Sequence, residues 1–500
     1  MTSGPETADS SVLAALVGDF PNRRILCVGD VMVDHSLYGE VKRLSPEAPV
    51  PVVRVTRETS ELGGAGNVAR NIAALGAACA FVSIIGDDRG GQQASELLSR
   101  LPRTDPYLRV AKGRETTIKS RFFSNDGHHL LRADRETVMP LTPTDLKDLE
   151  HAAAAEVARC DAVILSDYAK GTLTTGPLDK NLGAAVIATA RALGKPVIVD
   201  PKGTGYERYR GATIITPNRA ELADATGMPV DSDAAIVAAG QALRGHTGAE
   251  AILVTRSGEG MSLIAPHGVH HLPAENREVA DVTGAGDTVI AVFSLAVAGG
   301  ASLVAAARLA NIAAGIVVGR QGTAVATASD LAAALLQSGL AGAEGKVVDR
   351  ATASSRAAEW RRQGLKVGFT NGCFDLLHPG HISLLRQARG ACDRLVVGLN
   401  SDGSVRRLKG ETRPVQNESA RATVMASLAS VDLVVIFAED TPAELIKQVH
   451  PDVLVKGADY TRDKVVGGDF VESYGGRVIL ADVVPSFSTT ATIASLKKPG

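Results

Sequence analysis

The sequence predicts an α/β protein whose two domains each contain a largely parallel sheet. Short runs rich in Val and Ile alternate with Ala-rich amphipathic stretches along most of the chain, and this rhythm is typical of consecutive strand–helix–strand units. The chain has 500 residues, whereas a single hydrophobic core rarely grows beyond about 250–300 residues. The alternation pauses once and restarts on a smaller scale, so we expect a large domain followed by a smaller one.

The first part of the chain carries the strands of the larger domain. Five short apolar runs are expected to be buried strands: Arg24–Val28, Ala162–Leu165, Pro196–Val199, Thr213–Ile215 and Ala251–Val254. Two polar, β-prone segments, about Ser36–Thr56 and Thr116–Arg132, are expected to form a small antiparallel sheet, a lid over a cleft. Residues 288–307 are uncharged. They contain Gly299-Gly300, so two packed core helices are expected rather than a membrane span.

A change of composition marks the expected domain boundary. From about Ser329 to Ser355 the chain is rich in Ala, Gly and Ser and shows no strand pattern. We therefore predict a first domain of residues 1–340, a linker region of residues 341–355 and a second domain of residues 356–500. Strand candidates of the second domain are Lys366–Phe369, Arg394–Gly398, Leu433–Phe437, Val453–Val455 and Arg477–Leu480.

Charge and cysteine content argue against several classes of protein. The 53 basic and 55 acidic residues leave a formal net charge of −2, which gives little support for binding to nucleic acid or to an acidic membrane. The five cysteines are scattered and form no Cys-x-x-Cys pair, so neither a disulfide framework nor a zinc knuckle is expected. The first ten residues lack the pattern of a secretory signal. We expect a cytoplasmic enzyme.

The segment Asp281-Val282-Thr283-Gly284-Ala285-Gly286-Asp287 precedes an apolar stretch that would continue as a helix. Its glycines let backbone amides turn inward at the positive end of that helix, which makes an anion hole. Asp287 would lie beside a transferred phosphoryl group, where a carboxylate can take the proton of an attacking hydroxyl. A glycine turn with a helix-capping aspartate is the alternative that this motif leaves open.

Two further motifs accompany this segment. Gly63-Gly64-Ala65-Gly66-Asn67 opens an Ala-rich helix after the first lid segment, and Thr216-Pro217-Asn218-Arg219-Ala220-Glu221 follows a buried strand. With the motifs in this order, about the first 335 residues resemble the ribokinase-like family of sugar kinases. The resemblance implies a ribokinase-like three-layer α/β/α domain with a small β lid.

The resemblance also implies roles for individual residues, which match the family's motifs position by position. Asp287 would be the general base, and the amides of Gly284, Ala285 and Gly286 would form the anion hole. The element Asn218, Arg219, Ala220 and Glu221 would bind ATP and organise Mg²⁺. Glu221 would act through water because Mg²⁺ dehydrates reluctantly, so no direct protein cage for a metal is expected. The sugar hydroxyls would be contacted by Asp34, Gly63, Gly64 and Asn67.

Other readings of these residues stay open at this stage. Asp34 could be a turn residue, and Asn67 could cap a helix that begins at Val68. Lys202 is either a phosphate contact or a solvated turn lysine. Four basic residues of the second lid segment could bind a distal phosphate of the substrate or could simply protect an edge strand from pairing; they are Arg114, Lys119, Arg121 and Arg132.

Two histidines lie three residues apart directly after an apolar strand-like stretch of the second domain. His378 and His381 can both project from the first turn of a helix, near its positive end, and donate hydrogen bonds to the phosphates of a nucleotide. An attacking phosphate is already ionised and needs no strong base, so catalysis would depend on positioning and on cationic donors. Metal binding is the alternative, but no third ligand is obvious.

The run Gly368–His381 contains Gly-Phe-x-x-Gly-x-Phe-Asp-x-x-His-x-Gly-His, and it resembles the motif of small Rossmann-like cytidylyl- and adenylyltransferases. The resemblance implies a Rossmann-like nucleotidyltransferase domain. Thr370 and Phe374 would line its first loop, and Lys409 and Arg413 would neutralise substrate and pyrophosphate charge. Arg421 would do the same or be an inert helix-surface residue. Contacts to the nucleotide phosphates are implied for Lys456, Ser488, Thr489 and Thr490.

The order of the two domains resembles the bifunctional enzymes of ADP-heptose synthesis. Such an enzyme would phosphorylate O1 of D-glycero-β-D-manno-heptose 7-phosphate and, in a separate reaction, join heptose 1-phosphate to AMP. The resemblance implies ATP as the substrate of both domains, Mg²⁺ as cofactor, a role in lipopolysaccharide core synthesis and a homo-oligomer, a dimer. The same chemistries on another sugar or polyol phosphate, with CTP, are the alternative. A regulatory protein on two inactive folds is disfavoured because Asp287 and both histidines are present.

Overall fold

The computed structural model describes residues 10–173, 181–275, 279–320, 322–457 and 461–482. The chain divides into two compact units, Met1–Leu335 and Leu336–Gly500. The division falls inside helix α10 (Ala328–Glu344). The predicted linker of residues 341–355 includes the end of this helix and the start of α11 (Arg350–Arg362). The predicted boundaries, with the first domain ending at residue 340 and the second beginning at residue 356, stay a prediction.

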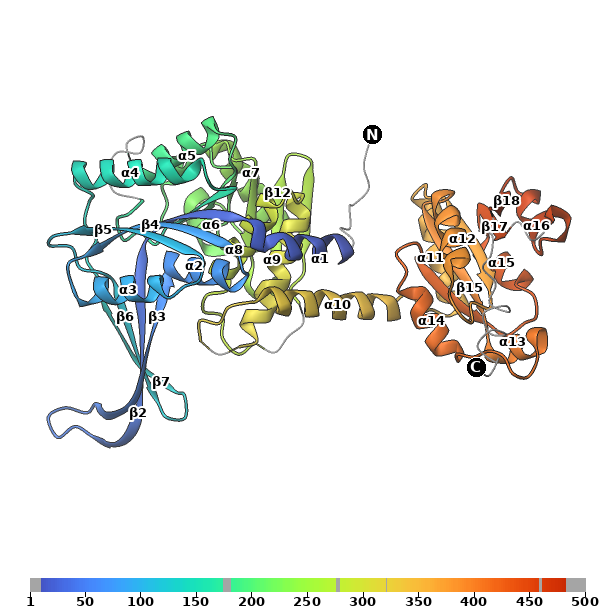
Figure 1. Ribbon diagram of the computed structural model, residues 1–500, viewed down its shortest axis with the longest axis horizontal. Helices are drawn as coiled ribbons and strands as arrows, with labels where there is room; N and C mark the ends of the chain where they lie inside the picture. Colours follow the sequence, from blue (N-terminus) through green and yellow to red (C-terminus); the bar gives the residue numbers. More distant parts are fainter. Residues whose placement is uncertain (1–9, 174–180, 276–278, 321, 458–460, 483–500) are drawn as a thin grey trace, which may run out of the picture. The chain divides into compact units, whose positions relative to one another are not determined.

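The first unit is built on a sheet of nine strands (Figure 1). In spatial order they are β13 (Gly268–Leu272), β12 (Met261–Ala265), β11 (Ala251–Thr255), β10 (Ile214–Ile215), β9 (Val197–Asp200), β8 (Ala162–Ser166), β1 (Arg24–Gly29), β4 (Ala78–Gly86) and β5 (Thr104–Ala111). Pairing is parallel from β11 to β5 and antiparallel between β11, β12 and β13. The five strands predicted for this part of the chain are all present.

Helices cover both faces of this sheet. One face packs against α1 (Ser10–Asp19), α2 (Ala65–Ala74), α3 (Arg89–Ser99), α8 (Ala285–Ala298), α9 (Leu303–Val318) and α10. The other packs against α4 (Pro143–Val157), α5 (Leu182–Ala192), α6 (Arg219–Thr226) and α7 (Asp233–Thr247). Short 3-10 turns are η1 (Phe20–Asn22), η2 (Tyr206–Tyr209) and η3 (Ser257–Glu259). The predicted three-layer arrangement is confirmed (Figure 1).

Strand β1 shows why the apolar runs are continuous rather than alternating. Ile25 and Cys27 enter the core on one face of the sheet, whereas Leu26 and Val28 enter the core on the other. Successive side chains of a strand point to opposite faces, and helices cover both faces here, so the buried positions Ile25–Val28 are all apolar.

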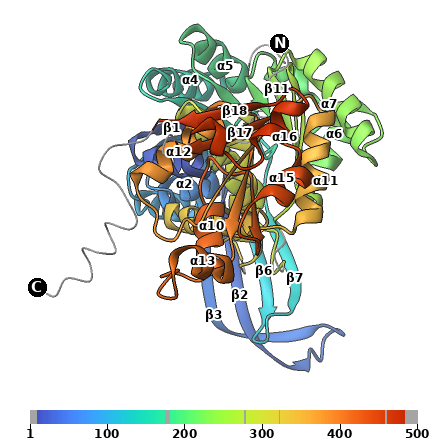
Figure 2. The same cartoon turned by 90° about the vertical axis from the view of Figure 1, so that its right-hand side faces the viewer.

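The lid is a separate sheet of four strands, in the order β3 (Pro51–Gly64), β2 (Val31–Leu44), β6 (Ile118–Ser124), β7 (His129–Arg135). The four strands lie side by side and extend away from the body of the first unit (Figure 2). The prediction of a purely antiparallel lid is wrong in one respect, because β2 and β6 pair in parallel. Strand β2 is the first strand of the hairpin β2–β3, and β6 is the first strand of the hairpin β6–β7. These two first strands lie next to each other, so they run in the same direction.

The uncharged residues 288–307 form most of α8, a turn at Gly299 and Gly300 and the start of α9. Both helices pack in the core on one face of the large sheet, as predicted. Among the described residues, no helix is long and apolar enough to cross a membrane.

The second unit contains a parallel sheet in the order β16 (Leu433–Phe437), β15 (Arg394–Asn400), β14 (Val367–Gly372), β17 (Val453–Gly457), β18 (Arg477–Ala481). One core lies under α12 (Pro379–Gly390) and α14 (Glu418–Ala426), and the other under α11, α15 (Ala443–Val449) and α16 (Gly468–Ser473). Helix α13 (Asp402–Lys409) and the turn η4 (Arg462–Lys464) complete the unit. The strand order reverses at β14, and ligands of such sheets bind at the carboxyl ends of the strands at this point.

Candidate active sites

Asp287 lies in the first turn of α8, where the sequence motif placed it. Gly284 precedes the helix with φ of 81°, and a Cβ there would lie 2.8 Å from Asn67 Nδ2, so only glycine fits. The first amides of a helix have no partner within it, and those of Ala285 and Gly286 therefore stand at the positive end of α8. The Ala285 amide donates to the Val282 carbonyl at 3.3 Å, and the anion hole beside the carboxylate stays a prediction.

Two donors hold the Asp287 carboxylate, which is buried. Asn67 Nδ2 donates to Oδ2 at 2.7 Å, and the Tyr168 hydroxyl donates to Oδ1 at 2.7 Å. Burial raises the pKa of Asp287 to about 6, although the hydrogen bonds from Asn67 and Tyr168 lower it. The carboxylate is thus ionised at neutral pH with a pKa close to it, which suits a general base.

Tyr168 is not among the residues predicted from the sequence; it follows strand β8 in the run Ser166-Asp167-Tyr168-Ala169-Lys170-Gly171. Its place after the carboxyl end of a buried parallel strand is a signal that could have found it. Asp30 fixes the loop, because its carboxylate accepts hydrogen bonds from the backbone amides of Tyr168, Lys170 and Thr172.

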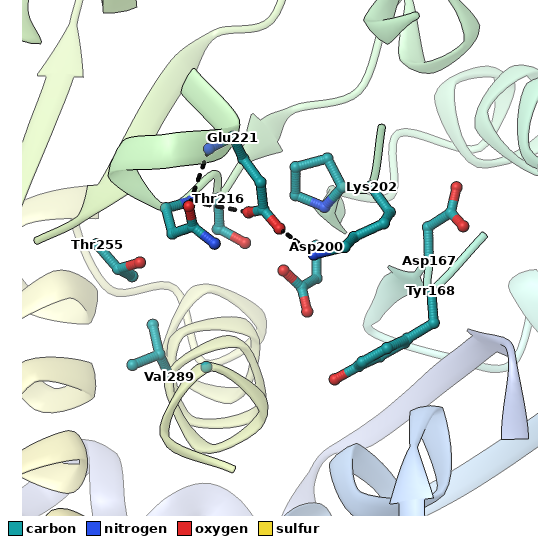
Figure 3. Close-up of a pocket in the computed structure, with 11 residues that line it drawn as sticks. Asp167, Tyr168, Asp200, Lys202, Thr216, Glu221, Thr255 and Val289 are labelled. Atoms are coloured by element: carbon teal, nitrogen blue, oxygen red, sulfur yellow. Dashed lines mark hydrogen bonds and ion pairs between the residues drawn. The ribbon is translucent and has the colours of Figure 1, made fainter. Parts of the chain in front are cut away.

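A pocket of about 210 Å³ lies beside this carboxylate. Gly286 and Tyr168 line it, together with Asp200, Lys202 and Glu221 among others (Figure 3). Burial is the main cause that raises the pKa of Asp200 well above its usual range, and the nearby Asp287 and Glu221 add to it. Burial likewise raises the pKa of Asp167, another lining residue, to about 7.

The Asn-x-x-Glu element forms the entrance to α6. Asn218 Oδ1 accepts from the Glu221 amide at 2.9 Å, and Glu221 Oε2 accepts from the Asn218 amide at 3.0 Å, a reciprocal helix cap. Glu221 Oε1 also pairs with Lys202 Nζ at 2.8 Å (Figure 3). Asn218 and Glu221 line the pocket, whereas Arg219 and Ala220 are not among its lining residues. Lys202 lines the pocket although its side chain is half exposed, so its role as a phosphate contact stays a prediction.

The residues implied in sugar binding lie around the base of the lid. Asp34 is on strand β2, not in a turn, and pairs with Arg121 at 2.5 Å. A Cβ at Gly63 would meet Asp34 Oδ2 at 2.3 Å, and Gly64 has φ of 59°, so both positions require glycine. Asn67 is the third residue of α2, which begins at Ala65, so it does not cap a helix starting at Val68.

The basic residues of the second lid segment are engaged within the protein. Arg114 is buried and donates to the carbonyls of Met139 and Lys170. Arg132 pairs with Asp134 at 2.5 Å. Burial lowers the pKa of Lys119, and the nearby Asp34 opposes this.

In the second unit, His378 caps the N-terminus of α12 and His381 lies in its first turn. The two rings stack with centroids 3.8 Å apart, and Phe374 contacts the His381 ring edge-on at 5.1 Å. Burial lowers the pKa of His378, and burial together with His378 lowers the pKa of His381 to about 4. Burial therefore favours the neutral form of both imidazoles in the ligand-free protein, and their role as phosphate donors stays a prediction. A bound phosphate would favour their protonation.

The other residues implied in nucleotide binding differ in burial and in their hydrogen-bond partners. Thr370 is buried on β14, and its hydroxyl has no hydrogen-bond partner within the described part of the chain. Lys456 is mostly buried on β17, and its Nζ donates to the Asn371 carbonyl at 3.2 Å. Lys409 is exposed at the end of α13. Arg413 pairs with the buried Asp375. Ser488, Thr489 and Thr490 lie outside the described residues.

Arg421 is buried and contacts several loops, so its interpretation as a helix-surface residue is wrong. Its guanidinium donates to the carbonyls of Cys373, Asn400 and Gln416 and pairs with Asp402 at 2.7 Å. These groups belong to the loop before the histidines, the end of β15 and the segment before α14. The residue therefore holds together the loops that border the histidine pair.

A metal site made by the protein alone is not found in the part of the chain that the structure describes, where no group of three or more His, Cys, Asp or Glu could hold an ion. The zinc alternative for the histidine pair thus has no third ligand among these residues.

Comparisons with known proteins agree with the two units. The model of the pfkB family of carbohydrate kinases matches residues 22–330, and the model of cytidylyltransferase-like proteins matches residues 369–496. The fold of the first unit is similar to phosphofructokinase-2 from Escherichia coli, with a TM-score of 0.52 and 21% identity over 63% of this chain and 98% of that one. Ribokinase from Arabidopsis thaliana gives a TM-score of 0.50, with 21% identity and the same coverage. The chain is a carbohydrate kinase joined to a nucleotidyltransferase.

Relatives that match nearly the whole chain make the assignment more specific. The bifunctional protein HldE of Rhodospirillum rubrum is 55% identical over 485 residues, which are 97% of this chain and 97% of that protein. HldE of Paramagnetospirillum magneticum is 54% identical, and HldE of Caulobacter vibrioides is 52% identical; each match covers 97% of this chain and 99% of the relative. The chain belongs to the HldE family of bifunctional proteins.

Proposed function

We propose that the first unit transfers the γ-phosphoryl group of ATP to O1 of D-glycero-β-D-manno-heptose 7-phosphate, with Asp287 as the general base. As a member of the HldE family, the chain is a bifunctional heptose kinase and adenylyltransferase. The observation that carries the base assignment is the buried Asp287 carboxylate at the N-terminus of α8, next to the pocket lined by Gly286 and Tyr168. Its pKa of about 6 allows it to accept a proton at neutral pH.

The surrounding residues fit the other parts of a phosphoryl transfer site. The amides at the start of α8 would stabilise the charge that develops on the transferred group. Lys202 would contact the ATP phosphates from the pocket wall, where it pairs with Glu221. Asp34, Gly63, Gly64 and Asn67, at the base of the lid, would contact the sugar hydroxyls.

Mg²⁺ would accompany ATP in this site. Asp200 and Glu221 provide carboxylate oxygens in the pocket, the kind of ligand that Mg²⁺ prefers. Glu221 already caps α6 and pairs with Lys202, so a contact through water fits it better than direct ligation. The ion would neutralise phosphate charge.

The second unit would join heptose 1-phosphate to AMP from a second ATP and release pyrophosphate. Between the two steps a separate phosphatase would remove the 7-phosphate. His378 and His381, at the positive end of α12, would donate hydrogen bonds to the ATP phosphates. Thr370, Phe374, Lys456 and the segment Ser488–Thr490 would complete the nucleotide site, and Lys409 and Arg413 would neutralise pyrophosphate charge.

A homo-oligomer, a dimer, is also part of the proposal. The first lid hairpin exposes several large apolar side chains, among them Val41, Leu44, Val50 and Val55. Exposed apolar side chains gathered on one element favour association. Light scattering of the purified protein would give the mass of the assembly, and a monomer at micromolar concentration would contradict this part.

Two assays on the purified protein test the function. One supplies ATP, Mg²⁺ and heptose 7-phosphate and measures ADP. The other supplies ATP, Mg²⁺ and heptose 1-phosphate and measures pyrophosphate and ADP-heptose. Formation of both products is expected. Replacing ATP by CTP in the second assay tests the nucleotide, and a faster reaction with CTP would overturn the adenylyl assignment.

A further inference from the structure

Both oxygens of the Asp287 carboxylate are held by side chains from other parts of the chain. Tyr168 approaches Oδ1 from the loop after β8, and Asn67 approaches Oδ2 from α2, each at 2.7 Å. An ionised carboxylate offers about four acceptor positions. Two remain for the hydroxyl of the substrate, so the two contacts can orient the base without blocking it.

Arg70 determines which end of the Asn67 amide faces the base. Arg70 Nη1 lies 3.3 Å from Asn67 Oδ1, while Asn67 Nδ2 lies 2.7 Å from Asp287. A guanidinium only donates and an ionised carboxylate only accepts. The amide between them therefore has one favourable orientation, with its oxygen toward Arg70 and its NH₂ toward Asp287.

Arg70 is anchored in turn to the base of the lid. Its guanidinium lies 3.3 Å from Glu61 Oε2, near the end of lid strand β3, and donates to the Thr323 carbonyl at 3.2 Å. The Thr323 hydroxyl also bonds the Glu61 carboxylate. On the other side of the base, Lys119 of lid strand β6 lies 5.5 Å from the centre of the Tyr168 ring. Both contacts to the base thus connect to the lid.

We propose that Tyr168 and Arg70 are positioning residues of the kinase reaction, Tyr168 by direct contact with Asp287 and Arg70 through Asn67. The inference rests on the proposed role of Asp287 as the base. The two residues hold the carboxylate plane in one orientation and favour its ionised form, so that the base is aligned before the sugar binds.

The charged and titratable groups that face Asp287 come from several elements. Asp34 on β2 and Asp200 at the end of β9 are acidic, Lys119 on β6 is basic, and Cys27 on β1 is a buried thiol. Tyr168 stays protonated and able to donate, because burial and the neighbouring Asp287 raise its pKa well above the usual range. The hydroxyl of Tyr168 and the amide of Asn67 are the groups that hydrogen-bond the carboxylate directly.

Tyr168→Phe in the full-length enzyme tests whether Tyr168 positions Asp287. Removal of a donor to an ionised carboxylate raises the pKa of that carboxylate, so the acid limb of the kinase kcat profile should move upward by about one pH unit. Because the pKa of Asp287 is about 6, this shift should lower kcat roughly twofold at pH 7 and roughly fivefold at pH 6, while KM for heptose 7-phosphate changes less than about twofold. A changed KM with an unmoved acid limb would overturn the proposal, because the hydroxyl would then act on the sugar.

Arg70→Met tests whether Arg70 positions Asp287 through Asn67. The amide of Asn67 loses its fixed orientation, and the acid limb should move in the same direction by a smaller amount. Arg70→Lys keeps a positive donor but not the two-nitrogen contact to Asn67 and the Thr323 carbonyl, so it should restore the profile only in part. If Arg70→Met leaves both kcat and the limb unchanged, Arg70 has no positioning role.

Three controls separate this inference from its alternatives. Tyr206→Phe removes a buried hydroxyl that makes no hydrogen bond within the described residues, and its acid limb should stay in place. The thermal unfolding transition of the first unit, measured by calorimetry for each variant, reports whether that unit is folded. Asp287→Asn tests the base itself: if it retains kinase activity, the proposed function fails. If only Asp287→Asn is inactive and the Tyr168→Phe profile is unmoved, the positioning role alone fails.

Discussion

In the two candidate active sites, burial shifts the pKa of the central groups in opposite directions. Burial raises the pKa of Asp287 to about 6, and two hydrogen-bond donors pull it back toward its ordinary value. In the second unit burial lowers the pKa of both His378 and His381. Burial favours the neutral form in each case. The hydrogen bonds of Asn67 and Tyr168 oppose this effect at Asp287, and its pKa is about 6. The backbone hydrogen bond at Leu376 opposes it at His381, but the pKa there is still lowered to about 4. A base must be ionised before its substrate arrives, whereas a phosphate donor can gain its charge when the phosphate binds.

The comparison predicts that the kinase depends on one carboxylate. Asp287→Asn keeps the size of the side chain and removes its ability to accept a proton. Kinase activity should fall roughly 10²–10⁴-fold, whereas the transferase rate should be unchanged because the two sites lie in separate units. ADP and pyrophosphate release from the same preparation check this. Loss of both activities would contradict the independence of the sites.

The next largest effect is expected on stability, at Arg421. Arg421→Leu removes a fully buried guanidinium and leaves Asp402 and three carbonyls without their donor. The loss of one partner of a buried ion pair costs about 3 kcal/mol or more. The unfolding midpoint of the second unit should drop, and transferase activity should fall with it. Calorimetry together with the kinase rate, which should not change, checks the prediction. If the unfolding midpoint of the second unit does not change, the buried contacts of Arg421 do not stabilise that unit and the prediction is contradicted.

The dependence on pH should separate the two sites. Asp287 takes up a proton as the pH falls through about 6, so kcat/KM of the kinase should decline about tenfold per pH unit below that value. The pKa of His381 in the free protein is about 4, so kcat/KM of the transferase should show no histidine titration between pH 6 and 8. Profiles of kcat/KM, which report the pKa values of the free enzyme, check both expectations. Parallel profiles for the two reactions would contradict the assigned roles.

The smallest effect is expected when the chain is divided. Leu331 and Leu335 of α10 are buried in the core of the first unit, and Ala353 and Ala357 of α11 are buried in the second. Residues 1–344 and 345–500, expressed separately, should therefore fold and keep their rates within about twofold. Aggregation of both halves would indicate a large obligate interface.

Much of the fold could be predicted because the apolar runs are local signals. The strands chosen from the sequence are present in both units. Four strands of the large sheet were missed: β4, β5, β12 and β13. Strand β4 contains the apolar, β-prone run Phe81–Ile85, so it could have been predicted from the sequence. Strand β13 is Gly268-Val269-His270-His271-Leu272, which lacks a clear apolar pattern, and it is defined by its pairing with β12.

The sequence by itself determined the elements whose function depends on adjacent residues. A glycine turn with Asp287 at a helix start, and two histidines one turn apart, are visible because backbone geometry links neighbours. Only the tertiary structure decided which polar groups meet when they are buried. Tyr168 and Asn67 lie 119 and 220 positions from Asp287, and Arg421 has no local feature that marks it as buried. Buried polar groups require hydrogen-bond partners, but the fold chooses them from distant parts of the chain.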